Sequence, residues 1–208
     1  MDNTVATQTV NLFSDSPDGS DRLTNHATVT VTGLEAGANW EYSINGGGSW
    51  STGASSDNRF ELADGVYDSD AVLVRQTDIA GNVSSNGALA AATIDTVAPA
   101  APSVALVDAG SGGSTSDATV TISGLEADVS WEYSTDSGSI WTPGDSSDNT
   151  FELADGSYAT GQVAVRQTDV AGNVGLPTAL TESFTVTTTA PTVVIFDFVT
   201  GKSSTVGG

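Results

Sequence analysis

The chain has 208 residues, with 26 Asp and Glu against 5 Lys and Arg, which gives a formal net charge of −21. So acidic a chain repels phosphate backbones, which argues against nucleic-acid binding. It has no cysteine, so disulfides and thiolate metal sites are excluded. No apolar run approaches the roughly 20 residues that span a bilayer, so membrane insertion is not expected.

The predicted elements of the first part are short strands. Residues 8–13 alternate polar and apolar side chains, as a half-buried strand does. The same pattern, or a short apolar run, predicts further strands at 27–33, 40–44, a hairpin partner ending at Trp50, 59–62, 71–75 and 88–94. Trp40, Tyr42 and Ile44 are expected on one face of their strand. Turns rich in Gly, Asp and Ser separate these strands, and no segment shows a helical period. The predicted fold class is all-β, with antiparallel β-sandwich domains.

A repeat divides the chain in two. Residues 74–83 read VRQTDIAGNV, and residues 165–174 repeat them at a spacing of 91 with one change, Ile79 to Val170. Between 29–89 and 120–180, 36 of 61 positions are identical, which indicates tandem duplication. The predicted domains are 1–96 and 97–188. Residues 189–208 contain another strand-like run at 192–200 and are interpreted as the start of a following domain.

The joining segment, residues 94–102, contains Pro99 and Pro102. Each proline fixes one φ angle, so this connection is expected to be stiff. Monomeric behaviour is expected, with the neighbouring repeats of the same chain as partners.

Two local motifs are interpreted as fold devices. Residues 134–141 fit the Asp-box pattern S-x-D-x-G-x-x-W, and residues 43–50 match it with Asn45 in place of the aspartate. Such a motif makes a tight hairpin similar to those of sialidases, in which it is structural. Tyr67 and Tyr158 follow Asp-Gly in a position that resembles the tyrosine corner of immunoglobulin-like sandwiches. Trp40 and Trp131 are expected in the cores.

Catalysis is not expected. His26 is the single histidine and has no counterpart in the second repeat, so the repeats cannot each hold a Ser/His/Asp triad. Paired carboxylates for glycoside hydrolysis could come from Glu35, Glu41 and Glu61 and their copies, but no apolar pocket that would raise one pKa is indicated.

The acidic turns suggest a cation site. In a seven-strand sandwich the chain enters at one end and leaves at the other, so the turns gather at the two ends. The expected ligands where the first domain ends are Asp15, Asp18, Asp21, Asp64 and Asp95. Those where the second begins are Glu126, Asp128, Asp169 and Asn173, and Asp78, Asn82 and Asp155 are the equivalent residues of the other copy. Oxygen ligands of this kind and number suit Ca²⁺. The alternative is that Asp and Asn stand there because they favour turns, and that the charge serves solubility.

Taken together, the motifs D-G-x-Y, V-R-Q-T-D-x-A-G-N-V and D-T-x-A-P resemble the bacterial immunoglobulin-like extender repeats of giant type I-secreted biofilm adhesins of the RTX class. The resemblance covers nearly all of residues 1–191. It implies Ca²⁺-stabilised, linear spacer domains that project ligand-binding domains from the cell surface, exported by a C-terminal signal. The alternative function is a carbohydrate- or surface-binding module of such an adhesin, for which the four Trp residues could provide a platform.

This sequence also departs from the pattern. Thr187 replaces the linker Asp after the second repeat, and the loop at 108–117 is three residues shorter than its counterpart and has fewer acids. Both differences put a full calcium site at the second joint in doubt.

Overall fold

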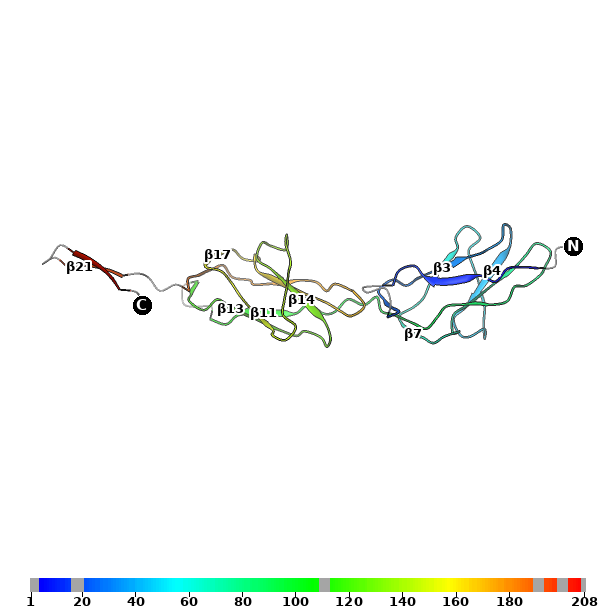
Figure 1. Cartoon of the computed structure of the whole chain (residues 1–208), viewed down its shortest axis with the longest axis horizontal. Helices are drawn as coiled ribbons and strands as arrows, with labels where there is room; N and C mark the ends of the chain where they lie inside the picture. The colour runs from blue at the N-terminus through cyan, green and yellow to red at the C-terminus, as the bar shows by residue number, and fades with distance from the viewer. Residues whose placement is uncertain (1–3, 16–20, 109–112, 189–192, 198–201, 207–208) are drawn as a thin grey trace. The chain divides into compact units, whose positions relative to one another are not determined.

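The computed structural model describes residues 4–15, 21–108 and 113–188, together with the backbone of 193–197 and 202–206 (Figure 1). Every regular element in these ranges is a β-strand. None of the described residues forms a helix long and apolar enough to cross a membrane. Contacts divide the chain into two compact units between Ala98 and Pro99, and they group Val170–Asn173 with the first unit.

The first unit contains three small sheets. One has the order β1-β3-β6, and its strands are Thr9–Leu12, Thr28–Thr32 and Arg59–Glu61. A second has the order β5-β4-β8-β9, with strands Ser51–Thr52, Asn39–Ser43, Leu73–Thr77 and Gly87–Ala88. The third has the order β2-β10-β7, with strands Leu23–Thr24, Ala92–Ile94 and Gly65–Tyr67. All pairs are antiparallel except β2 with β10, which run parallel.

The second unit repeats this arrangement. Its sheets have the orders β11-β13-β16, β15-β14-β18-β19 and β12-β20-β17. The strands in chain order are Ser103–Leu106, Ser114–Thr115, Thr119–Ser123, Ser130–Ser134, Thr142–Pro143, Thr150–Glu152, Gly156–Tyr158, Ala164–Thr168, Thr178–Ala179 and Phe184–Val186. Farther along, β21 (Val193–Asp197) pairs antiparallel with β22 (Lys202–Val206), where a strand-like run was predicted.

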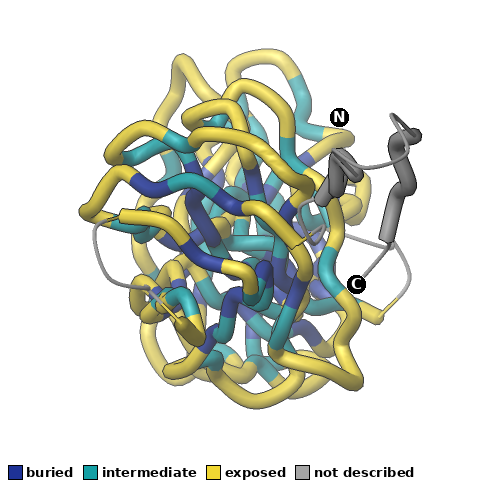
Figure 2. The backbone as a smooth tube through the Cα atoms, turned by 90° about the vertical axis from the view of Figure 1, so that its left-hand side faces the viewer, coloured by how far each residue is buried: buried dark blue, intermediate teal, exposed yellow. Residues whose placement is uncertain are grey.

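Each unit has its own core. Alternate residues of the strands point between the sheets because successive side chains of a strand face opposite sides. Val72 and Val74 and their copies Val163 and Val165 are at most 1% exposed. Trp40 and Trp131 are 3% exposed, as predicted, and each packs against a phenylalanine. Figure 2 shows buried backbone inside a shell of exposed turns. The fold class is therefore all-β, in two tandem β-sandwich domains.

Several strand predictions were wrong in detail. The expected strand 88–94 is divided between β9 and β10, which belong to different sheets. The expected strand 71–75 lies at 73–77, because residue 71 still belongs to the preceding turn. Ile44 does not share the buried face with Trp40; it is 50% exposed in the hairpin turn after β4. The short strands β2 and β7 were not predicted.

Two ends can be defined in the first sandwich. The entry end comprises 4–8, 33–38 and 76–84, where the Gln76 side chain bonds Ala6 and Gly33. The exit end comprises 13–15, 24–28, 62–65 and 94–96, where Asp95 and Thr96 bond to residues of the other segments. The chain therefore enters at one end of this sandwich and leaves at the other. The turns group at the two ends as the sequence analysis expected.

Candidate functional site

A buried glutamine organises the entry end. Gln76 is fully buried, and its Oε1 accepts a hydrogen bond from the Glu35 amide at 2.8 Å. Its Nε2 donates to the carbonyls of Ala6 at 3.0 Å and Gly33 at 3.1 Å. One side chain thus ties the incoming chain to the turn at 33–38, and its own polar atoms are satisfied, as burial requires.

The second unit keeps this device. Gln167 Oε1 accepts from the Glu126 amide at 3.0 Å, and Nε2 donates to the Ala100 carbonyl at 2.6 Å. The Glu126 carboxylate accepts from the Ala100 amide at 2.9 Å. Glu126, predicted as a cation ligand, therefore already holds the incoming backbone with one oxygen.

The acidic turn of the repeated decapeptide closes on itself in the first unit. Asp78 accepts hydrogen bonds from the Asn82 amide nitrogen at 2.8 Å and from Asn82 Nδ2 at 2.6 Å. The Asn82 side chain is the main reason that the pKa of Asp78 lies below its usual value. Asp78 and Glu35 also line the same hollow at this end.

The Asn173 side chain, equivalent to that of Asn82, reaches a backbone carbonyl. Asn173 Nδ2 donates to the Asp95 carbonyl at 2.8 Å, within the group of residues that contacts assign to the first unit. Two of the predicted site residues are thus adjacent. Asp169 is half-buried beside this turn, and Asp128 is exposed with φ 59°, where the first repeat has Gly37 with φ 81°.

The exit end uses its aspartates to fix the outgoing chain. Asp64 Oδ1 accepts from both the amide and the hydroxyl of Thr96, at 3.0 and 2.8 Å. Asp155 does the same with Thr188, at 2.8 and 2.7 Å. Asp95 Oδ1 accepts from the Val97 amide at 3.1 Å. The sequence analysis did not predict that Thr96 and Thr188 bond to these aspartates. The signal was present in both repeats, since each has an Asp-Gly turn and a Thr just after its last strand.

The first acidic loop carries an oxygen without a partner. Asp15 Oδ1 is buried and accepts no hydrogen bond from any described residue. Asp21 Oδ1 accepts from the Leu23 amide at 3.0 Å. Asp18 lies outside the described residues. An unsatisfied buried carboxylate oxygen is costly, and a hard cation is one group that would satisfy it.

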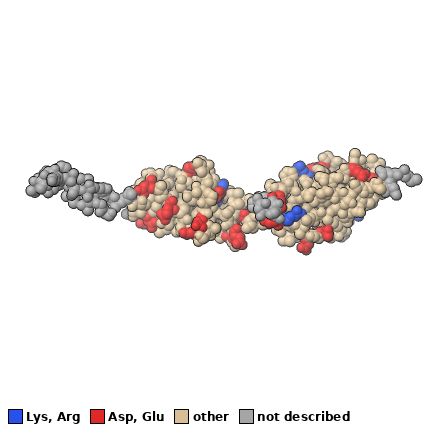
Figure 3. Space-filling model, viewed as in Figure 1, with Lys and Arg blue, Asp and Glu red and all other residues tan. Residues whose placement is uncertain are grey.

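The donor set fits calcium in kind. Every predicted ligand offers carboxylate or amide oxygen, which Ca²⁺ prefers. Within the described residues, however, no group of three or more His, Cys, Asp or Glu side chains is close enough to hold a metal ion. Figure 3 shows the acidic side chains spread over the visible face of each unit, with few basic ones among them. The ends are thus rich in suitable oxygens that are not gathered round one point.

All four tryptophans make contacts within the fold. Two of the four are core residues. The Arg75 guanidinium lies 4.0 Å from the Trp50 ring centroid, and Glu41 holds that arginine at 2.9 Å. Trp141, Arg166 and Glu132 repeat the arrangement, at 4.2 and 2.8 Å. An arginine therefore covers one face of each hairpin tryptophan.

The predicted hairpin and tyrosine motifs are confirmed. Asp136 Oδ1 accepts from the Ile140 amide and Asn45 Oδ1 from the Ser49 amide, each at 2.9 Å. The Tyr67 hydroxyl donates to the Ala63 carbonyl at 3.0 Å, and Tyr158 donates to Ala154 at 2.9 Å. These residues therefore serve the fold.

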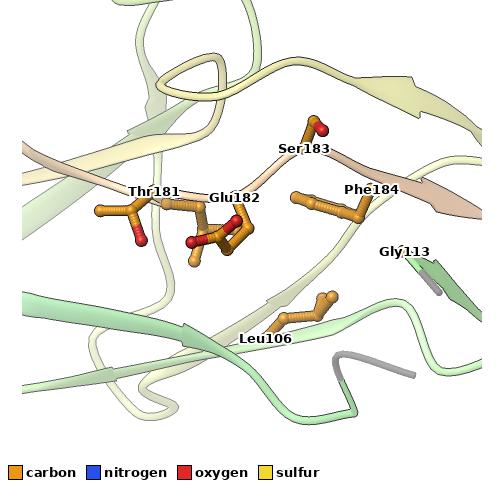
Figure 4. A pocket seen from close by; sticks show the side chains of 7 residues that line it. Leu106, Gly113, Thr181, Glu182, Ser183 and Phe184 are labelled. Atoms are coloured by element: carbon orange, nitrogen blue, oxygen red, sulfur yellow. The ribbon is translucent and has the colours of Figure 1, made fainter. Parts of the chain in front are cut away.

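The second unit contains a hollow that is partly apolar (Figure 4). Its described lining includes Leu106, Leu180 and Phe184, with Glu182 as its one carboxylate. Glycoside hydrolysis uses two carboxyl groups on either side of the scissile bond. These lining residues do not supply that pair.

No family model matches the sequence, and a search of curated proteins finds no match. Among solved structures, the fold is similar to fibronectin(III)-like modules of Clostridium thermocellum CbhA, with 14% identity, TM-score 0.42 and coverage of 76% of this chain and 84% of that one. It is also similar to a structure from a 1.5-MDa bacterial ice-binding adhesin, with 16% identity, TM-score 0.35 and coverage of 91% and 67%.

A third similar structure is the Bacteroides ovatus protein SGBP-B, solved with a mixed-linkage heptasaccharide. It has 14% identity and TM-score 0.23, and the match covers 87% of this chain and 46% of that one. The assignment of β-sandwich domains rests on the strand pairing described above.

Proposed function

We propose that the chain is a stretch of spacer repeats from a bacterial cell-surface adhesin, exported from the cell and made rigid by Ca²⁺ at the joints between repeats. One observation carries this proposal: the first sandwich takes in the chain at one end and releases it at the other, and the second copy follows with the same strand order. A domain of this kind adds length each time it is duplicated.

The local bonding also supports a spacer. In both copies a buried glutamine donates a hydrogen bond to the incoming chain, and an aspartate accepts hydrogen bonds from the outgoing chain. These bonds fix the direction in which the backbone enters and leaves each sandwich. These side chains have a structural role in the spacer, and we propose no enzymatic activity for the chain.

Calcium at the joint is supported by the kind of oxygen at the ends. The residues that would hold it are Asp15, Asp21, Asp64 and Asp95 from the first repeat, and Glu126, Asp128, Asp169 and Asn173 from the second. Several of these carboxylates bond through one oxygen in the bonds described, as Asp64 and Asp95 do. The cation would supply charge neutralisation for a chain of net charge −21.

The size of the effect follows from linkage. Extracellular calcium modules typically bind with Kd of about 10⁻⁴–10⁻³ M. At free calcium roughly 10–100 times Kd, each site stabilises the folded state by about 1.4–2.7 kcal/mol. That is a large share of the stability of one domain.

Small-angle scattering of the whole chain tests the proposal. We expect a fixed maximum dimension in calcium and a broader distance distribution in chelator, together with a higher Tm in calcium. Asp95→Ala should weaken the calcium response. Glu152→Gln is the matched control, because it removes one charge from β16, near Thr119 and away from the residues named at the joint. Identical scattering and Tm in calcium and chelator would sink the calcium proposal.

A further inference from the structure

The sequence contains two Asn-Gly dipeptides, Asn45-Gly46 and Asn86-Gly87, and both lie in the first repeat. The second repeat has Asp136-Ser137 and Pro177-Thr178 at these positions. Asn-Gly is the dipeptide most prone to succinimide formation, because glycine puts no side chain in the way of its own backbone nitrogen. The two sites therefore invite comparison.

Both polar atoms of the Asn45 side chain make hydrogen bonds. Its Oδ1 accepts from the Ser43 hydroxyl at 2.8 Å and the Ser49 amide at 2.9 Å, and its Nδ2 donates to the Ser49 hydroxyl at 2.9 Å. The nitrogen that would attack it, that of Gly46, donates to the Ala71 carbonyl at 2.9 Å. Both the electrophile and the nucleophile are thus engaged in the folded hairpin.

Asn86 is in the opposite situation. Its side chain is exposed and makes no hydrogen bond with the residues that the structure describes. Gly87 begins β9, a strand of two residues at the edge of its sheet. A strand of two residues has few ladder hydrogen bonds, and local opening frees the Gly87 nitrogen to reach the Asn86 side chain.

Packing against the first strand requires glycine at position 87. A Cβ on residue 87 would lie 2.1 Å from the Gln8 carbonyl oxygen, a backbone atom that cannot move aside cheaply. A larger residue would therefore push β9 away from the first strand, so the first repeat keeps a reactive dipeptide in which Asn86 is exposed and Gly87 is buried.

We propose that Asn86 is a site of spontaneous deamidation in the folded protein, whereas Asn45 is protected. The Gly87 nitrogen loses its proton and attacks Asn86 Cγ. The bond from Cγ to Nδ2 breaks, and ammonia leaves with the proton. Water then opens the five-membered succinimide at either carbonyl, giving aspartate or isoaspartate, with no oxidant or reductant required. The product adds a negative charge, and the isoaspartate form inserts a methylene into the main chain ahead of β9.

The experiment is incubation of the whole chain at mildly alkaline pH, with timed peptide mapping by mass spectrometry. Trypsin releases Asn45 in peptide 23–59 and Asn86 in peptide 76–166, so the two sites are read separately. We expect Asn86 to react at least about tenfold faster than Asn45 in the folded chain, the difference made by a barrier about 1.4 kcal/mol lower. Fragment-ion sequencing should place the mass gain at residue 86, because the Asp155-Gly156 dipeptide of the same peptide can form isoaspartate only without a change of mass.

Denaturant provides the control, because in the unfolded chain both sites should react at similar rates. Asn86→Ser should abolish the reaction in peptide 76–166, while Asn45→Asp, which installs the residue of the second repeat, should leave the Asn86 rate unchanged. Equal rates at the two sites in the folded chain, or an unreactive Asn86 in a folded chain whose denatured form reacts, would overturn the proposal.

Discussion

The two repeats share one scaffold but differ in matched pairs of residues. Register aligns Thr9 with Ser103, so Gln8 corresponds to Pro102, and Ser84 corresponds to Gly175. In the first repeat the Ser84 hydroxyl donates to Gln8 Oε1 at 3.0 Å. In the second repeat both polar partners are gone together. A buried polar pair is thus exchanged as a unit, because half of it would leave an unsatisfied group.

A second matched pair lies in the entry-end turns. Gly37 and Ile79 of the first repeat correspond to Asp128 and Val170 of the second. A Cβ on Gly37 would lie 2.9 Å from Ile79 Cδ1, so the larger apolar side chain and the glycine go together. The one change within the decapeptide is therefore matched by a change in the turn that packs against it.

The strongest test of the shared scaffold is the core tryptophan. Trp40→Ala and Trp131→Ala should each cost about 3–5 kcal/mol, because each removes a buried indole. The two indoles are equally buried and donate to carbonyls at 3.1 and 3.2 Å, so the costs should be equal. Calorimetry should show one repeat melting early and the other unchanged. Loss of both transitions in one single variant would contradict independent cores.

Exchanging Gln8 and Ser84 should change the free energy of unfolding by less than the tryptophan variants do, and it tests one specific contact. Ser84→Gly should cost about 1–3 kcal/mol, because Gln8 Oε1 loses its donor and the Gln76 amide loses an acceptor in a buried setting. Adding Gln8→Pro, which completes the second repeat's pair, should recover the part of that loss that comes from Gln8. Urea unfolding of the two single variants and the double variant forms the cycle. Strictly additive costs would show that the two residues are not coupled.

The stabilities of the two hairpin turns should depend differently on pH in acid. The Ile140 amide and then the Ser134 hydroxyl, donating to Asp136, lower its pKa below the usual 3.8. A lowered folded pKa means that this stabilisation is complete above pH 3.8 and is lost as pH falls through the folded pKa. Asn45 does not ionise, so the first hairpin lacks this dependence. Asp136→Asn should remove it from the second repeat, and Asn45→Asp should add it to the first. NMR titration checks the pKa, and a value at or above 3.8 for Asp136 would contradict the assignment.

The sequence predicted the parts of the fold that have a strong local pattern. Period-two alternation at 27–33 and the paired aromatics at 40–42 correspond to β3 and β4. The strand β2 has two residues and no pattern, since its structure comes from pairing with β10, some 70 positions away. The run at 88–94 is rich in alanine and shows no alternation that would reveal its change of sheet.

The candidate site was predictable in its location more than in its bonding. Turn composition placed the acids at the ends of the sandwich. It could not show that Asp64 bonds Thr96, because that contact joins residues 32 apart. Nor could it show that Gln76 is buried, because glutamine in a strand is usually read as an exposed side chain.

The parallel pairing of β2 with β10 has a mechanical consequence. Because β2 and β10 are parallel, tension that reaches β2 through the chain before it and β10 through the chain after it pulls the two strands in opposite directions along their own axes. The bonds from Thr93 to Arg22 and from Asp95 to Thr24 lie across that direction and are loaded in shear together. A strand pulled this way cannot be peeled off one hydrogen bond at a time. The sandwich is therefore built to resist extension along the line in which its chain runs.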